Sequence, residues 1–251
     1  FLLIAGDSGV GKSSLCRAGL LPALMRGALG FEGRVWSTAT VVPGKRPLTA
    51  LLAALAQALN VEEGALARGS GPQGVGVGPA ALGLLGNTRG VVLLIDQMEE
   101  LCTLADPREA QAFAETLLEL CARNPSVRVI GSVRGDFVAR VALLPGLGDL
   151  IARSMYVLPP LSRDGMREAI VGPARVKGYR FESDEFVDTL ISSADKSDAA
   201  LPLLQFALAE LWEARNPNSQ IIPASALAEL GGVSGALAKH ADSVVSSLSP
   251  N

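Results

Sequence analysis

The sequence predicts an α/β fold, in which a five-stranded parallel sheet with flanking helices is followed by an all-helical region. Segments rich in Val, Leu and Ile alternate with helical segments up to about residue 158, a pattern typical of parallel sheets. Hydrophobic residues make up 49% of the chain and aromatic residues 4%, so the core must be largely aliphatic. We therefore expect two domains, at residues 1–158 and 159–251.

The composition narrows the classes of function. A net charge of -3 disfavours a protein that coats nucleic acid, so nucleic acid is not an expected partner. Cys16, Cys102 and Cys121 are widely spaced and lack a histidine cluster, which argues against a disulfide framework or a zinc site and favours a reducing cytoplasm. No apolar run is long enough for a membrane span. The chain begins on a strand-like segment without Met, and we expect it to be a fragment of a longer protein.

The first expected strand, at residues 1–5, leads directly into a glycine-rich loop. Residues 6–13 fit the pattern G-x-x-x-x-G-K-[ST], in which backbone N–H groups of the loop and of the following helix point at phosphate oxygens. Lys12 would add a positive charge, and Ser13 would offer its hydroxyl to Mg²⁺. The residues expected to bind nucleotide phosphates are Asp7, Ser8, Gly9, Val10, Gly11, Lys12, Ser13 and Ser14.

The next segments continue the alternation. A helical pattern follows the loop and is expected to be interrupted at Pro22. Residues 34–42 are rich in β-branched side chains and predict a strand, and residues 47–60 predict a helix opened by proline. Residues 64–79 form a glycine-rich surface excursion that contains G-x-G-x-x-G, but no strand precedes it, so a dinucleotide site is not expected there.

A carboxylate follows the most apolar strand of the chain. The strand at residues 91–95 ends at Asp96, and the carboxyl end of a parallel strand is where such sheets bind ligands. In a phosphate-loop protein Asp96 would hold the Mg²⁺ shell, and either Glu99 or Glu100 could polarise a water molecule. The alternative is an acidic helix start on the surface, which the helix dipole favours.

A third polar residue at a strand end is Arg134. A helix is expected from Asp106 to about residue 123. Asp106 can cap its N-terminus, a proline stands at its first position, and the Glu109 side chain is placed to accept a hydrogen bond from the Asp106 N–H. The strand at residues 127–133 then ends at Arg134, a candidate sensor of the terminal phosphate, although a surface ion pair is the alternative. Residues 154–158 predict the fifth strand.

The rest of the chain is expected to be helical. Helices are predicted at residues 162–177, broken at Gly172 and Pro173, and at residues 183–193 and 201–215. Two more are predicted within residues 224–248, with the start of a winged-helix region as an option for the end of the chain.

Five motifs now stand in order along the chain. They lie at residues 6–22 (GDSGVGKSSL and AGLLP), 94–101 (LIDQMEEL), 133–137 (VRGDF), 201–208 (LPLLQFAL) and 231–241 (GGVSGAL with His240 and Ala241). With them the chain resembles the bacterial novel STAND NTPase domain. STAND proteins are signal-transduction ATPases with numerous domains, distantly related to NB-ARC and AAA+ ATPases.

The resemblance implies an AAA+-like sheet with the phosphate-loop strand beside the sensor strand, and a helical lid. It implies a switch that binds ATP or ADP with Mg²⁺, and in which the bound nucleotide controls the conformation and the assembly of an oligomer. Protein partners would bind through flanking domains. By position, Lys12 and Ser13 would bind phosphate and Mg²⁺, Asp96 would hold the Mg²⁺ shell, Arg134 would sense the γ-phosphate, and Pro202 would pack on adenine. Hydrolysis is expected to be slow, because Gln97 stands directly after Asp96, where vigorous ATPases usually place a glutamate.

The sequence departs from the family pattern at two motif positions. Ala200 replaces the glycine expected before Leu201, and Met98 stands where an aromatic residue is usual. Neither change removes a chemical group.

Three other functions compete with an ATP-dependent switch. A non-hydrolysing, nucleotide-stabilised scaffold for protein partners is one. A GTPase is another, since residues 195–198 nearly spell N-K-x-D, although Asp195 takes the asparagine place. Residues 6–9 resemble the segment around a serine-protease nucleophile, but the single histidine, His240, comes after it and a protease needs it before. For His240 itself we expect a structural role.

Overall fold

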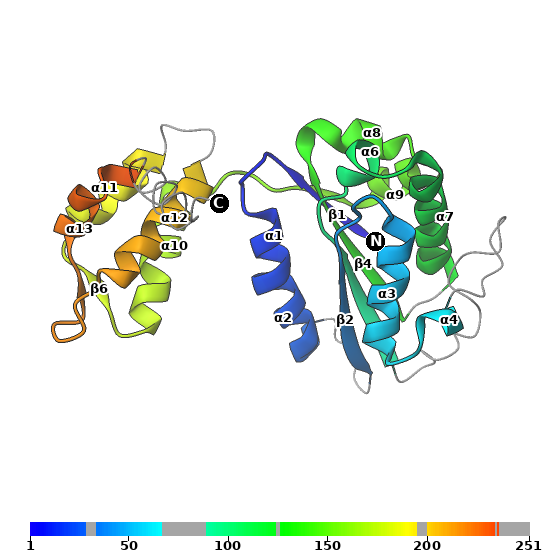
Figure 1. The fold of residues 1–251 in the computed structure, drawn as a ribbon, viewed down its shortest axis with the longest axis horizontal. Coiled ribbons are helices and arrows are strands. Elements are labelled where there is room, and N and C mark those ends of the chain that lie inside the picture. Colours follow the sequence, from blue (N-terminus) through cyan, green and yellow to red (C-terminus); the bar gives the residue numbers. More distant parts are fainter. Residues whose placement is uncertain (29–33, 67–88, 124–125, 195–199, 234, 236–251) are drawn as a thin grey trace, which may run out of the picture. The chain divides into compact units, whose positions relative to one another are not determined.

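The computed structural model describes residues 1–28, 34–66, 89–123, 126–194, 200–233 and 235 (Figure 1). The chain separates into two compact units, Phe1–Leu158 and Pro159–Asn251, which are described one at a time below. Most of the glycine-rich excursion, the N-K-x-D-like segment and His240 lie outside the described residues. No helix among the described residues combines the length and the hydropathy needed to cross a membrane.

The first unit is built on a five-stranded sheet in the order β2-β3-β4-β1-β5. Every neighbouring pair of strands is parallel, and each strand lies where the sequence predicts one. The bounds are β1 (Leu2–Gly6), β2 (Val35–Val41), β3 (Arg89–Ile95), β4 (Val127–Arg134) and β5 (Met155–Val157). The phosphate-loop strand β1 lies beside β4, with Gly6 paired to Arg134, so the expected adjacency of these two strands is confirmed.

Alternate side chains of the strands point to opposite faces of the sheet, and helices cover both faces. On one face Leu93 and Ile95 join a core with α3 (Pro47–Leu59), α7 (Pro107–Arg123) and α9 (Leu147–Ser154). On the other face Ile4 and Leu94 pack with Cys16 and Leu21 from the helical run that follows the phosphate loop. Within the first unit, Figure 1 shows this run on one side of the sheet and α3 and α7 on the other.

The helical run after the phosphate loop continues past Pro22, so the predicted interruption is wrong. It comprises α1 (Lys12–Ser14), a π-helical stretch at Leu15–Leu20, α2 (Leu21–Ala23) and a second π-helical stretch at Leu24–Ala28. The chain stays helical up to the proline, since Leu20 has φ of -67° and ψ of -53°, and the buried side chain of the adjacent Leu21 packs against the sheet. Gly27, with φ of 97°, lies near the end of the run.

Short helices complete the first unit. They are α4 (Glu63–Leu66), α6 (Glu100–Thr103), a 3₁₀ turn at Gly135–Phe137 and α8 (Val138–Ala142). The predicted cap of α7 forms in part: Asp106 Oδ1 accepts from the N–H of Arg108 at 2.9 Å, whereas the N–H of Asp106 donates to the Lys45 carbonyl rather than to Glu109.

The three cysteines are free thiols, as the sequence predicts. Burial raises the pKa of Cys16 to about 11, and the neighbouring charge of Asp96 adds to this shift. Burial also raises the pKa of Cys102 and of Cys121. All three side chains are therefore held as neutral thiols.

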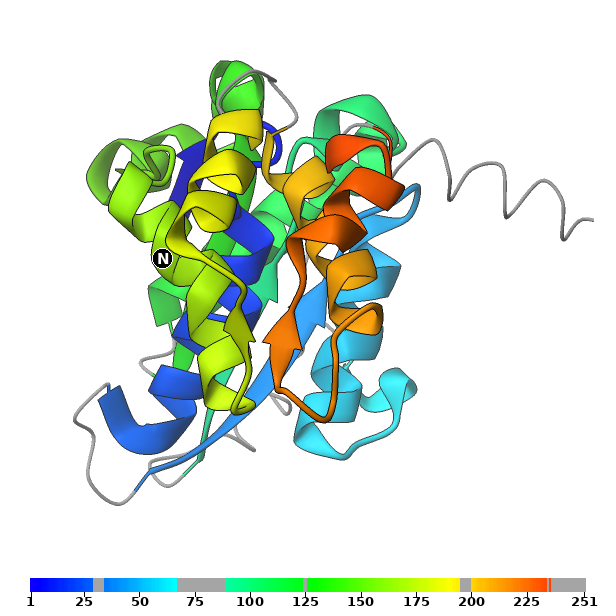
Figure 2. The same cartoon turned by 90° about the vertical axis from the view of Figure 1, so that its left-hand side faces the viewer.

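The second unit combines helices with a small sheet. Its helices are α10 (Arg163–Val176), α11 (Asp184–Ala194), α12 (Ala200–Glu213) and α13 (Ala224–Glu229). Strands β6 (Arg180–Phe181) and β7 (Ile221–Ile222) pair in parallel, so the expectation of helices alone is wrong in this respect (Figure 2). Strands of two residues are too short to leave a periodic pattern in a sequence.

Helix α10 also passes through a proline, and the break predicted at Gly172 and Pro173 is wrong. Pro173 lies three residues before the end of the helix and has no N–H to donate to the carbonyl four residues earlier, so α10 lacks one hydrogen bond there. Ile170 and Ala174, on either side, are buried in the core of this unit. Packing of these side chains offsets the unfavourable proline.

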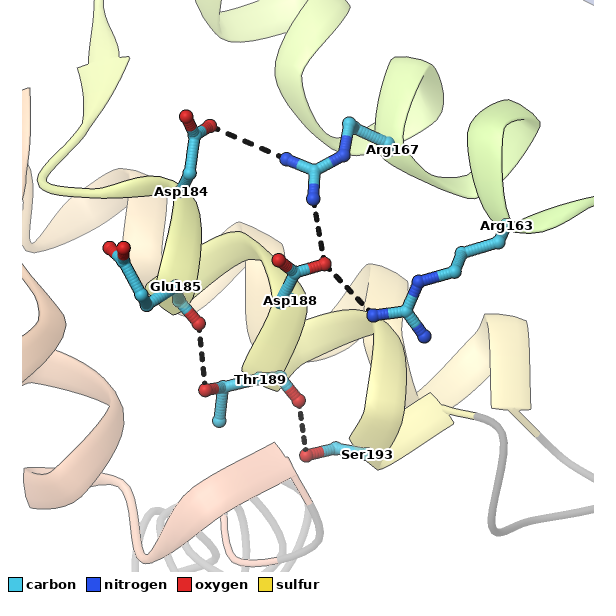
Figure 3. Close-up of polar contacts among 7 residues, drawn as sticks. All are labelled: Arg163, Arg167, Asp184, Glu185, Asp188, Thr189 and Ser193. Carbon is cyan, nitrogen blue, oxygen red and sulfur yellow. Dashed lines mark hydrogen bonds and ion pairs between the residues drawn. The ribbon is translucent and has the colours of Figure 1, made fainter.

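Two arginines of α10 bind acidic residues of α11 (Figure 3). Asp188 Oδ1 accepts from Arg163 at 2.9 Å and from Arg167 at 2.7 Å, and Arg167 also reaches Asp184 at 3.4 Å. The hydrogen bond from Arg163 is the main cause that holds the pKa of the Asp188 carboxyl below its ordinary value. Asp188 therefore joins the two helices through both arginines.

We expect Asp188→Asn to weaken the second unit at neutral pH, because the carboxylate shared by the two arginines is lost. The pKa of Asp188 is lowered on folding, so its contribution is present above 3.8, the ordinary value, and disappears as the pH falls through the folded-state value. Urea unfolding at neutral pH and in acid measures this. Asp184→Asn is the matched control, because its carboxylate is 91% exposed and only 3.4 Å from Arg167, and its effect should be smaller. An effect of Asp188→Asn that persists unchanged in acid would contradict the assignment.

Candidate nucleotide-binding site

The glycine-rich loop joins β1 to the first helical run. Gly9 and Gly11 have φ of 76° and 98°, values that favour glycine over any residue with a Cβ. A Cβ on Gly11 would meet no atom within 4 Å, so the backbone conformation rather than crowding requires glycine there. Asp7, Ser8 and Ser14 are exposed, whereas Val10 is buried and anchors the loop.

Lys12 is buried at the base of this loop, with 9% of its surface exposed. Its Nζ donates hydrogen bonds to the carbonyl oxygens of Gly6 at 2.8 Å and Asp7 at 2.7 Å. Burial lowers the pKa of Lys12, and the negative charge of Glu99 is the largest influence that opposes this. The ammonium group is thus held inside the loop, close to Glu99.

Other charged residues act on Lys12 as well. The negative charges of Asp7 and Asp96 raise its pKa, and the positive charge of Arg134 lowers it. Residues predicted separately from three stretches of sequence therefore lie within electrostatic reach of one ammonium group. Glu100 is not among the influences on the Lys12 pKa.

Asp96 follows β3 and is 2% exposed. Its Oδ1 accepts hydrogen bonds from Ser13 Oγ at 2.8 Å and Ser132 Oγ at 2.6 Å. Its Oδ2 accepts from Arg17, whose Nε lies at 3.1 Å and Nη2 at 2.9 Å. The structure thus brings together Ser13 and Asp96, which the sequence analysis paired as metal ligands.

Ser132 and Arg17 were missed by the sequence analysis. Ser132 is a polar residue that is 1% exposed within the apolar strand β4, and a buried hydroxyl needs a partner. Arg17 lies four residues after Ser13 on one helical run, a spacing that places two side chains on the same face. The register between β3 and β4 brings Ser132 to Asp96, and the packing of the helical run on the sheet brings Arg17 there.

The segment after Asp96 is fixed by β4. Gln97 has φ of 60°, and its N–H donates to Ser132 Oγ at 3.0 Å. The next residue, Met98, donates its N–H to the Ser132 carbonyl and is fully buried. Ser132 therefore holds both the Asp96 side chain and the turn that follows it.

The two candidate catalytic glutamates point to different parts of the sheet edge. Glu99 Oε2 accepts from the backbone N–H of Arg134 at 3.2 Å, at the end of β4. Glu100 Oε2 accepts from the N–H of Gly44 at 2.8 Å, beyond the end of β2. Of the two, Glu99 is the one that lies near the phosphate loop.

The Arg134 side chain pairs with Asp136, Nε with Oδ1 at 3.1 Å and Nη2 with Oδ2 at 2.8 Å. It also lies over the Phe137 ring at 5.2 Å. The pair is exposed, which is the surface ion pair considered as the alternative to a phosphate sensor. Pro202 lies in the first turn of α12 with an exposed side chain, and the structure describes it only within the second unit.

These groups fit a nucleotide bound with Mg²⁺. Ser13 Oγ and Asp96 Oδ1 are 2.8 Å apart, and hydroxyl and carboxylate oxygens are ligands that Mg²⁺ prefers. The described residues include no group of three or more His, Cys, Asp or Glu side chains suited to a metal. Mg²⁺ commonly binds through one or two protein oxygens together with phosphates, and Ser13 and Asp96 suit that mode.

The strand order, the loop after β1 and the carboxylate after β3 define an AAA+-like phosphate-loop fold. The chain belongs to the novel STAND NTPase 1 family, whose family model matches residues 1–251. The resemblance to the novel STAND NTPases found in the sequence is thereby confirmed. No curated protein sequence matches the chain significantly.

The solved structures with a similar fold include two proteins from Aeropyrum pernix. The ORC1 protein in complex with DNA has a TM-score of 0.60 and 18% identity, over 95% of this chain and 59% of that one. The ORC2 protein, solved as ADPNP-ADP complexes and in an ADP form, gives TM-scores of 0.59 and 0.61 at 13% identity, over 85% of this chain. The similarity covers 56% and 57% of those two chains, so this chain matches little more than half the length of each relative.

We expect Ser132→Ala to reduce the free energy of unfolding of the first unit by about 1–3 kcal/mol, because the buried carboxylate of Asp96 loses a donor and the Gln97 N–H loses its acceptor. Denaturant unfolding measures the loss. Ser154→Ala removes a hydroxyl that donates only to the Leu150 carbonyl, and it should cost less. Equal losses in the two variants would show that the contacts of Ser132 with Asp96 and Gln97 contribute no more to the free energy of unfolding than the single hydrogen bond of Ser154.

Proposed function

We propose that the chain is an ATP- and ADP-binding switch domain of a signal-transduction protein, with slow or conditional hydrolysis. The observation that carries the proposal is the hydrogen bond between Ser13 and Asp96, which joins the phosphate loop to the end of β3. Membership of an NTPase family and the ADP and ADPNP complexes of ORC2 support an adenine nucleotide as the ligand.

In this proposal the loop residues 7–11 and the start of the helical run bind the phosphates through backbone N–H groups. Lys12 would exchange the carbonyls of Gly6 and Asp7 for phosphate oxygens. Ser13 and Asp96 would hold Mg²⁺, which, when bound, supplies positive charge against the phosphates. Ser132 would keep the Asp96 carboxylate oriented through its 2.6 Å hydrogen bond.

Glu99 rather than Glu100 is the proposed group that orients and polarises the attacking water. Its charge acts on Lys12, and its Oε2 is held by the Arg134 N–H, whereas Glu100 is bound to Gly44 away from the loop. Two features support slow hydrolysis. The residue after Asp96 is Gln97, whose amide cannot take a proton, and the proposed sensor Arg134 must leave Asp136 before it can reach a phosphate.

Residues 159–251 are proposed to be the lid that responds to the nucleotide, with Pro202 against adenine and protein partners reached through flanking domains. We place the protein in the cytoplasm and expect nucleotide-controlled oligomers. The similar ORC1 protein was solved with DNA, but the net charge of -3 disfavours nucleic acid as a partner of this chain.

Isothermal titration of ADP and ATP with Mg²⁺ tests binding. We expect Lys12→Ala to weaken both nucleotides by about 10- to 100-fold, because charge-assisted hydrogen bonds to phosphate are worth about 1.5–3 kcal/mol. Lys177→Ala, which removes the same charge from an exposed position of the second unit, should bind like the wild type. Absence of nucleotide binding by the wild type would refute the proposal, and tighter binding of GTP than ATP would favour the GTPase.

Hydrolysis is tested by single-turnover assays on Glu99→Gln. We expect this variant to bind ATP like the wild type. Its rate of hydrolysis should fall by about 100-fold or more, which is the effect of losing a general base. Glu100→Gln is the matched control, and its rate should stay close to that of the wild type. Many turnovers per second by the wild type would contradict a slow switch, and no turnover at all would favour a non-hydrolysing scaffold.

A further inference from the structure

Both oxygens of the Asp96 carboxylate are occupied by hydrogen bonds and an ion pair from its own chain. An ionised carboxylate offers about four acceptor positions. On Oδ1 the hydroxyls of Ser13 and Ser132 donate, and on Oδ2 the Nε of Arg17 donates while its Nη2 forms an ion pair at 2.9 Å. A cation that binds at Asp96 must therefore displace a donor that is already there.

We propose that Arg17 is a resident counter-ion of Asp96 that Mg²⁺ has to displace, so that Arg17 sets the Mg²⁺ concentration at which the nucleotide site assembles. The inference rests on the proposed function, because it concerns the same site. It adds a regulatory residue that lies outside the G-x-x-x-x-G-K-[ST] pattern.

Arg17 is the donor best placed to leave. Ser132 is 1% exposed and also accepts from the Gln97 N–H, so its departure would disrupt the end of β3. Ser13 would itself be a ligand of the metal and can keep its hydrogen bond to Asp96. The Arg17 side chain is already 53% exposed, so its guanidinium group can rotate into water and be solvated there.

Charge explains why Arg17 and Mg²⁺ exclude each other. The Asp96 side chain is 3% exposed, and a buried carboxylate without a positive partner is strongly unfavourable. Either the guanidinium or the metal ion supplies that partner. Both together would bring like charges within a few ångströms of each other at one oxygen, where they repel.

The local helix geometry supports this role. Arg17 lies in the π-helical stretch Leu15–Leu20, four residues after Ser13, so the two side chains reach the same carboxylate from successive turns. Single π-helical turns are often found at functional sites. The neighbouring Cys16 is fully buried against the sheet and fixes the stretch in place.

The test is the Mg²⁺ dependence of ADP binding in Arg17→Met. We expect the Mg²⁺ concentration for half-maximal binding to fall by about 3- to 10-fold, while ADP affinity in EDTA stays within about twofold of the wild type. Arg26→Met removes the same charge from an exposed position of the same helical run and should leave the Mg²⁺ dependence unchanged. An unchanged Mg²⁺ dependence in Arg17→Met, or weaker ADP binding in EDTA, overturns the proposal, the latter because Arg17 would then bind phosphate.

A second readout needs no nucleotide. MgCl₂ should raise the unfolding midpoint of Arg17→Met more than that of the wild type, with NaCl of equal ionic strength as the control. Equal shifts in the two proteins overturn the proposal. If the wild type binds no ADP at any Mg²⁺ concentration, the proposed function fails, and the MgCl₂ comparison still decides the role of Arg17.

If Arg17→Met does not fold, Arg17→Lys replaces it. Because a lysine offers a single ammonium group, the Mg²⁺ concentration for half-maximal binding should lie below that of the wild type. An unchanged concentration overturns the proposal.

Discussion

The buried carboxylate of Asp96 is the interaction on which the rest of the site depends. It accepts hydrogen bonds from Ser13 and Arg17 of the first helical run and from Ser132 of β4. Because β4 lies between β3 and β1, these hydrogen bonds tie the phosphate loop to the middle of the sheet. A charge held at 2% exposure is stable only with such partners, so the position of Asp96 requires the surrounding polar residues.

Three charged side chains of the site have partners within the chain. Lys12 donates to loop carbonyls, Asp96 binds Arg17, and Arg134 binds Asp136. A ligand with phosphates and a divalent cation would have to exchange all three sets of contacts. Such an exchange reduces net affinity, but it couples ligand binding to side-chain movements at the ends of β1, β3 and β4. A nucleotide switch requires this kind of coupling.

Local sequence rules failed at two prolines and at one small sheet. Pro22 and Pro173 were expected to interrupt helices, yet both helices continue because neighbouring side chains are buried in a core. The pair β6 and β7 joins residues far apart in the sequence, and two-residue strands carry no periodicity. In each case tertiary packing outweighed local propensity.

The sequence by itself determined the class of fold, the five strands of the sheet and the position of the phosphate loop, because apolar periodicity and the G-x-x-x-x-G-K-[ST] spacing are local properties. It also named Asp96, Glu99, Glu100 and Arg134 as strand-end candidates. Only the tertiary structure separated Glu99 from Glu100 and brought Ser132 and Arg17 to Asp96. The physical reason is that these contacts follow from the register between parallel strands and from the face on which a helix packs, and neither is written in any short stretch of sequence.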